Sequence, residues 1–122
     1  MSSRNHHDSR ERAWTSMIMI NLFENDKNVT IEVTGHGDDT DQSCARVSTF
    51  CDCIQLFYSK IIDKAIKEYG YTCIKINKVK MYKKGLSNTF YNTLSYLIKL
   101  EQLYRKSIKI VLKGESKNGK NN

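Results

Sequence analysis

A short polar turn separates two strand-like stretches near the start of the chain, and this pattern constrains the fold more than any other feature. The first stretch, residues 17–23, is almost entirely apolar. The second, residues 29–34, alternates β-branched apolar residues with polar ones, which is the period of a half-buried strand. Residues 24–28 between them are polar and favour a turn. The sequence therefore predicts an antiparallel hairpin with one buried face.

Two longer segments have the apolar spacing of amphipathic helices. In residues 43–69, apolar side chains recur every three or four positions, and Gly70 follows at a position where glycine commonly ends a helix. A second segment with this spacing covers residues 87–105, and we interpret Ser87 as its N-cap.

The remaining regular segments predict further strands. Tyr71–Asn77 has the alternation of a strand, and Val79 and Met81 continue it at the opposite parity, which indicates a tight turn or a bulge after Asn77. Ile108, Ile110 and Leu112 recur at every second position and predict a last strand. The predicted order is ββαββαβ. It favours an α+β fold, a two-layer sandwich in which two long helices cover one face of a mixed, mostly antiparallel sheet.

The 122 residues are enough for one domain, which we place at residues 17–113. Residues 1–16 are polar and are predicted to be a disordered extension, and residues 114–122 are predicted to be a disordered tail. No apolar run approaches the roughly 20 residues of a membrane span, and the start of the chain does not resemble a signal peptide. We expect a cytoplasmic protein with no membrane partner, whose four cysteines are reduced.

The positive charge is concentrated in the second half of the chain. Residues 60–113 contain 13 Lys or Arg against 3 Asp or Glu, whereas residues 1–59 contain 5 against 9. Such an asymmetry is typical of proteins with acidic partners, so RNA contact is one interpretation. A lysine-rich solvated surface is the alternative, because lysines outnumber arginines and arginine is preferred for bidentate recognition.

One histidine and one cysteine lie at positions that suit nucleophilic catalysis. His36 follows the second predicted strand between two glycines, and Cys44 is in the first turn of the first predicted helix. The positive end of a helix dipole favours the thiolate, and helix N-terminal amides could stabilise an oxyanion. His36 would then accept the thiol proton and return it to the leaving amine. The glycines at 35 and 37 would let the loop open and close around an extended peptide.

The same residues allow a plainer interpretation, in which Cys44 is structural and His36 belongs to a loop. The other thiols are weaker candidates. Cys51 lies on the apolar stripe of the predicted helix, and Cys53 points away from Cys51. Cys73 is expected to pack within a strand. No paired metal-ligand spacing and no phosphate-binding glycine loop is present, so we expect no metal and no cofactor.

These residues resemble the motifs of the ribosomal-processing cysteine protease family, Prp. The family pattern is a strand that ends in Gly-His, a flexible loop, and Asp-x-x-Cys-Ala-x-x-Ser at the start of a long helix. Gly35-His36 is similar to the first part, and residues 41–48, with Asp41, Cys44 and Ser48, are similar to the second. The order of predicted elements in residues 17–113 also resembles that family.

The resemblance implies a cysteine endopeptidase that uses a His36/Cys44 dyad, with Gly35, Gly37, Asp41 and Ser48 supporting the loop and the helix start. It also implies a homodimer and a substrate: the N-terminal extension of a large-subunit ribosomal protein, or a phage structural protein. Two alternatives remain open. The chain could be a catalytically inactive relative that binds a ribosomal protein or RNA through its lysine-rich half, or a dimeric scaffold without a ligand.

Overall fold

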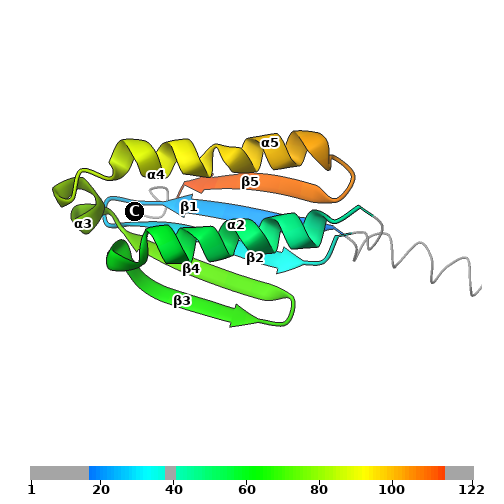
Figure 1. Ribbon diagram of the computed structural model, residues 1–122, viewed down its shortest axis with the longest axis horizontal. Coiled ribbons are helices and arrows are strands. Elements are labelled where there is room, and N and C mark those ends of the chain that lie inside the picture. Colours follow the sequence, from blue (N-terminus) through cyan, green and yellow to red (C-terminus); the bar gives the residue numbers. More distant parts are fainter. Residues whose placement is uncertain (1–16, 38–40, 115–122) are drawn as a thin grey trace, which may run out of the picture.

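The computed structural model describes residues 17–37 and 41–114. Of the segments predicted to be disordered, residues 1–16 and 115–122 lie outside these residues, whereas Gly114, predicted to begin the tail, is the last residue of β5. The regular elements, labelled in Figure 1, are β1 (Ile18–Glu24), β2 (Asn28–Gly35), α2 (Ser43–Phe57), a 3₁₀ turn η1 (Ser59–Ile61), β3 (Ile62–Glu68), β4 (Tyr71–Asn77), α3 (Lys78–Lys83), α4 (Ser87–Leu94), α5 (Tyr96–Leu103) and β5 (Ile108–Gly114).

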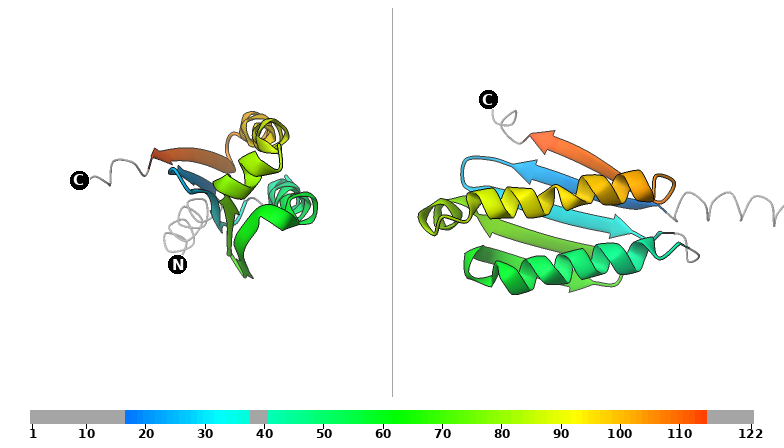
Figure 2. Two further views of the ribbon diagram at one scale, coloured as in Figure 1. Left: turned by 90° about the vertical axis from the view of Figure 1, so that its left-hand side faces the viewer. Right: turned by 45° about the horizontal axis from the view of Figure 1, so that its top comes forward.

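The strands form one five-stranded sheet in the order β3-β4-β2-β1-β5. All neighbouring pairs are antiparallel except β1 and β5, which are parallel. Helices α2, α4 and α5 lie on the same face of the sheet (Figures 1 and 2). The predicted two-layer α+β sandwich with a mixed, mostly antiparallel sheet is therefore confirmed.

The core lies between this sheet face and the helices, because each strand directs alternate residues toward it. Two alternating residues of each of β1, β2 and β4 are buried there, and β1 pairs with β2 in antiparallel fashion, which confirms the predicted hairpin and its buried face. The buried residues from the strands are Ile18, Ile20, Val29, Ile31, Ile74, Ile76 and Ile108, and those from the three long helices are Ser43, Val47, Phe50, Cys51, Ile54, Phe90, Leu97 and Leu100.

The first predicted helix is too long, because α2 ends at Phe57 and residues 62–68 form strand β3. The chain leaves the helix at Tyr58, whose backbone has φ −118° and ψ 25°. Beyond the short turn η1, the backbone of β3 pairs with β4, placing Ala65 opposite Ile74 and Lys67 opposite Thr72. Gly70 does not end a helix. It occupies the two-residue turn of the β3–β4 hairpin with φ 76°, a conformation that glycine adopts without strain.

The strand predicted to continue through Val79 and Met81 is also wrong. Asn77 and Lys78 begin α3 instead of a bulge, because the Asn77 side chain accepts the Lys80 N–H at 2.9 Å and caps the helix. Met81 is fully buried against the core. The number of strands is nevertheless the five predicted, because β3, within the predicted first helix, takes the place of the predicted strand at Val79 and Met81.

The second predicted helix is divided into α4 and α5 at Ser95. The hydroxyls of Thr89, Thr93 and Ser95 each donate to a carbonyl three or four residues earlier, and such bonds compete with the helical backbone pattern. Ser87 does not act as an N-cap: α4 begins after Leu86 without a side-chain cap hydrogen bond.

Candidate active site

The ends of two elements bring His36 and Cys44 to one pocket. His36 directly follows β2, and Cys44 is the second residue of α2. Both line a hollow of about 260 Å³ whose other wall is the β3–β4 hairpin. Gly35 and Ser48, two of the predicted supporting residues, line the same hollow. Ser48 lies one helical turn after Cys44.

The thiol of Cys44 is exposed and receives a backbone hydrogen bond. The Gly37 N–H donates to Cys44 Sγ at 2.9 Å. The first amides of a helix lack acceptors within the helix and carry its positive dipole end, and Cys44 belongs to this first turn. The sulfur therefore lies beside the Gly37 amide at the first turn of α2.

Gly37 brings its amide to Cys44 because it has no side chain. Gly37 is buried, and a Cβ built on it would overlap the Ser43 side chain and lie 3.1 Å from Ile18 Cδ1. Gly35 has φ 88° and would direct a Cβ into the Met17 carbonyl. Both glycines are therefore needed for the close approach of β2's end to its neighbours.

Asp41 connects the start of α2 to the strand β5. One carboxylate oxygen accepts the Ser43 N–H at 2.9 Å, and the other accepts the hydroxyl of buried Ser107, just before β5. Ser107 also accepts the N–H of Ile18 through its carbonyl at 2.7 Å. Desolvation alone would raise the pKa of Asp41, but the hydrogen bonds from Ser107 and Ser43 outweigh it and lower the pKa below its usual value.

The turn between β3 and β4 borders the imidazole of His36. The ring of Tyr69 lies 4.7 Å from the His36 ring, centroid to centroid, at an interplanar angle of 43°. Gly70 approaches so closely that a Cβ built there would lie 3.3 Å from His36 Nε2. Neither Tyr69 nor Ser107 was predicted from the sequence to belong to the site. Their roles depend on the hairpin and on contact with β5, neither of which leaves a local pattern.

Of the other three cysteines, Cys51 lines the same hollow but is buried, whereas Cys53 and Cys73 do not line it. Cys51 is buried in the core as predicted, and burial raises the pKa of its thiol to about 11. Cys53 lines a separate hollow between α2 and α4–α5, and Cys73 is half-buried in β4. Within residues 17–37 and 41–114, no group of three or more His, Cys, Asp or Glu side chains could hold a metal ion. In the same part of the chain, no helix has the length and apolar character needed to cross a membrane.

The chain thus forms a five-stranded mixed sheet with helices on one face, and the end of one strand faces the start of a helix across a pocket. No protein-family model and no curated protein sequence matches this chain. Solved structures do match. The ribosomal processing protease Prp from S. aureus in complex with a substrate peptide has a TM-score of 0.65 at 19% identity, covering 80% of this chain and 100% of that one.

Two further structures have the same fold. The S. aureus protease with a covalently linked product peptide has a TM-score of 0.59 at 21% identity, covering 80% of this chain and 100% of that one. SMU.848 from Streptococcus mutans has a TM-score of 0.61 at 17% identity, covering 81% of this chain and 96% of that one. The resemblance to Prp is therefore confirmed at the level of the fold.

Proposed function

We propose that this protein is a cysteine endopeptidase of the Prp type, with Cys44 as nucleophile and His36 as general base and acid. The observation that carries the proposal is that His36 and the exposed thiol of Cys44 line one pocket at the strand end and the helix start. The Prp fold of the chain supports the same assignment.

The proposed reaction is acyl transfer through a thioester. His36 takes the proton of Cys44, and the thiolate attacks the carbonyl carbon of the scissile peptide bond. In this proposal, amides of the first turn of α2 other than that of Ser43, which is bonded to Asp41, stabilise the oxyanion. The C–N bond then breaks, and His36 gives its proton to the leaving amine. A water molecule, deprotonated by His36, hydrolyses the thioester and restores Cys44.

Four further residues support the geometry in this proposal. Gly37 holds its N–H against the sulfur, and Gly35 allows the turn that presents His36. Asp41 fixes the first amide of α2. Ser48, one turn beyond Cys44, lines the pocket in which the peptide would bind.

The substrate we propose is the N-terminal extension of a large-subunit ribosomal protein or of a phage structural protein. The S. aureus neighbour is a ribosomal processing protease crystallised with peptides, which supports a peptide substrate. We further propose that the protein acts as a homodimer in the cytoplasm. Analytical ultracentrifugation at several concentrations tests the dimer.

The experiment is to incubate the full chain with a ribosomal protein that carries its N-terminal extension and to follow its mass. Loss of the extension is expected with the wild type and with Cys73→Ser, a matched thiol control. Cys44→Ser should leave the substrate intact. No cleavage by the wild type, or equal cleavage by Cys44→Ser, would overturn the proposal and favour the inactive, partner-binding alternative.

A further inference from the structure

A groove of about 520 Å³ lies between helix α2 and the pair α4–α5. These helices lie next to each other over the same face of the sheet (Figure 2). On α2 the groove is lined by Ala45, Thr49, Cys53 and Phe57, which recur at every fourth position and so form one stripe along the helix. Tyr96, at the start of α5, forms part of the facing wall. We call this feature the α2 groove.

The α2 groove begins beside the proposed nucleophile. Ala45 follows Cys44 in the chain, and Gln42, which also lines the groove, directly precedes α2. The hollow that contains His36 is lined by a different set of α2 residues: Cys44, Val47, Ser48 and Cys51. Because successive residues of a helix are turned by about 100°, this set and the stripe lie on opposite faces of α2. The exposed thiol of Cys44 therefore lies between the hollow and the start of the groove.

The surface of the α2 groove is suited to apolar side chains. Phe57 is 67% exposed and Tyr96 is 41% exposed. The buried Phe50, which also lines the groove, has its ring 6.1 Å from that of Tyr96 in a stacked arrangement. Among the described residues that line the groove, Arg46 is the only charged one. Covering such a surface with apolar groups removes it from water, which is favourable.

The direction of the proposed reaction determines which part of a substrate reaches the groove. As general acid, His36 must lie within hydrogen-bond reach of the leaving amine, so the amine side of the scissile bond faces the hollow that contains His36. In an extended chain, the two sides of a peptide bond lead in opposite directions. The acyl side therefore leads away from His36, across the start of α2. For a protease that removes an N-terminal extension, this acyl side is the extension.

We propose that the α2 groove binds the N-terminal extension of the substrate as an extended, mainly apolar segment. This inference rests on the proposed protease function. The stripe from Ala45 to Phe57 is about 18 Å long, at about 1.5 Å per helical residue, and an extended chain advances about 3.3 Å per residue. The groove thus holds about five residues before the scissile bond, and Phe57 contacts the one farthest from it. Continuity with Cys44 favours the substrate over a second copy of this chain as the occupant.

Two peptides cut from the sequence of the extended ribosomal protein, with five and with two residues before the scissile bond, test the proposal on the full chain. Phe57→Asp should raise KM for the longer peptide by about tenfold or more with little change in kcat, because it removes binding shared by substrate and transition state. The shorter peptide does not reach Phe57, so this variant should cleave it like the wild type.

Leu56→Asp is the matched control for Phe57→Asp. Leu56 is the preceding residue of the same helix and is 71% exposed, but it does not line the groove. It should match the wild type with both peptides, and thermal unfolding checks that both variants keep the fold. An unchanged KM of Phe57→Asp for the longer peptide, or an equal rise in Leu56→Asp, would overturn the proposal. Dissociation of a dimer by Phe57→Asp would also overturn it, because the groove would then belong to a second copy.

Cys53 reports on occupancy of the groove without catalysis. In Cys44→Ser, the extended ribosomal protein should protect Cys53 from a bulky maleimide, whereas Cys73, on β4 and outside the groove, should react as before. Protection of Cys53 by this protein, when the wild type does not cleave it, would support the groove and overturn only the proposed catalysis. Cleavage by the wild type without protection of Cys53 would overturn the groove and leave the proposed catalysis intact.

Discussion

The backbone N–H of Gly37 donates a hydrogen bond to the sulfur of Cys44 at 2.9 Å. This contact links the loop that follows β2 to the first turn of α2, and so it links His36 to the proposed nucleophile. It exists because residue 37 has no side chain, since a Cβ there would overlap the Ser43 side chain.

Replacing Gly37 with alanine should therefore displace the loop and misplace His36 relative to Cys44. Because a misplacement of about 1 Å can cost about 100-fold in rate, we expect kcat/KM for peptide cleavage to fall by about that factor. The rate of Cys44 alkylation should fall as well. Gly85→Ala controls for a general loss of stability: its φ of 69° makes alanine strained there, but a Cβ would meet nothing within 4 Å and the position is remote in sequence from His36 and Cys44. Equal alkylation rates for Gly37→Ala and the wild type would contradict the role of this contact.

Asp41 should stabilise the protein in a pH-dependent way. Hydrogen bonds lower its pKa in the folded state, so its contribution is present above the usual pKa of the carboxyl and is lost as the pH falls through the lowered value. Asp41→Asn should reduce the free energy of unfolding by about 0.5–2 kcal/mol at neutral pH, as for the loss of a helix cap. The difference from the wild type should shrink in acid. Urea unfolding from neutral to acidic pH measures it.

Ser107→Ala should resemble Asp41→Asn in this measurement, because it removes the hydroxyl that orients the carboxylate. Asp52→Asn, which breaks an exposed ion pair with Lys67, should cost less than about 1 kcal/mol. If the difference in the free energy of unfolding between Asp41→Asn and the wild type stays constant across the acidic range, the ionised Asp41 carboxylate does not stabilise the protein.

Tyr69 should act as a positioning residue for the imidazole. Its ring lies 4.7 Å from that of His36, yet the side chain is 94% exposed, so it contributes little to the core. Tyr69→Ala should lower kcat and alter its pH profile without changing thermal stability, whereas Tyr69→Phe should retain the wild-type profile. If both variants match the wild type, Tyr69 has no part in orienting His36.

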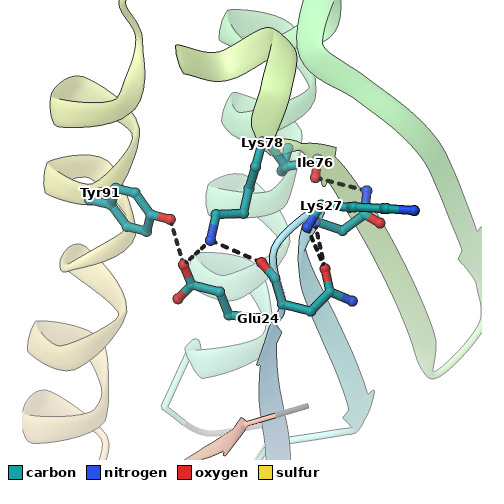
Figure 3. A network of polar contacts seen from close by, with 7 residues as sticks. Glu24, Lys27, Ile76, Lys78 and Tyr91 are labelled. Atoms are coloured by element: carbon teal, nitrogen blue, oxygen red, sulfur yellow. Dashed lines mark hydrogen bonds and ion pairs between the residues drawn. The ribbon is translucent and has the colours of Figure 1, made fainter. Parts of the chain in front are cut away.

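The contact between Lys78, the first residue of α3, and Glu24, the last residue of β1, should be a main source of stability where these two elements meet (Figure 3). Lys78 is 13% exposed at its side chain and makes two hydrogen bonds there, so Lys78→Met should cost about 1–3 kcal/mol. Desolvation opposes ionisation of Glu24, but the bonds from Lys78 and Tyr91 and the charge of Lys78 lower its pKa. This stability should therefore fade as the pH falls below the usual pKa of a glutamate, and urea unfolding in acid checks the sign. If a double-mutant cycle of Lys78→Met and Glu24→Gln shows no coupling in the free energy of unfolding, the ion pair does not stabilise the protein.

Local pattern was sufficient for the elements that hold the proposed dyad. The alternation in β2 and the helical spacing of α2 are properties of neighbouring residues, so the strand end at Gly35 and the helix start near Ser43 could be located from the sequence. The placement of His36 and Cys44 at these two ends follows from the positions of the elements.

Long-range contacts determine the features that local sequence pattern did not predict, namely strand β3, the position of Tyr69 and the bond between Asp41 and Ser107. Residues 62–68 have a spacing compatible with a helix, and they form a strand because their backbone pairs with β4. That hairpin carries Tyr69 to His36. The bond between Asp41 and Ser107 joins residues 66 positions apart, and only the docking of β5 beside β1 brings them together.

Alkylation of the four cysteines, mapped by peptide mass spectrometry at neutral pH, tests the pairing of His36 with Cys44 most directly. Cys51 is an internal reference, since its pKa of about 11 keeps it a thiol. The pairing predicts that iodoacetamide labels Cys44 well ahead of Cys53 and Cys73, and that His36→Ala slows labelling at Cys44 alone. Labelling of Cys44 no faster than Cys53, together with no effect of His36→Ala, would contradict it.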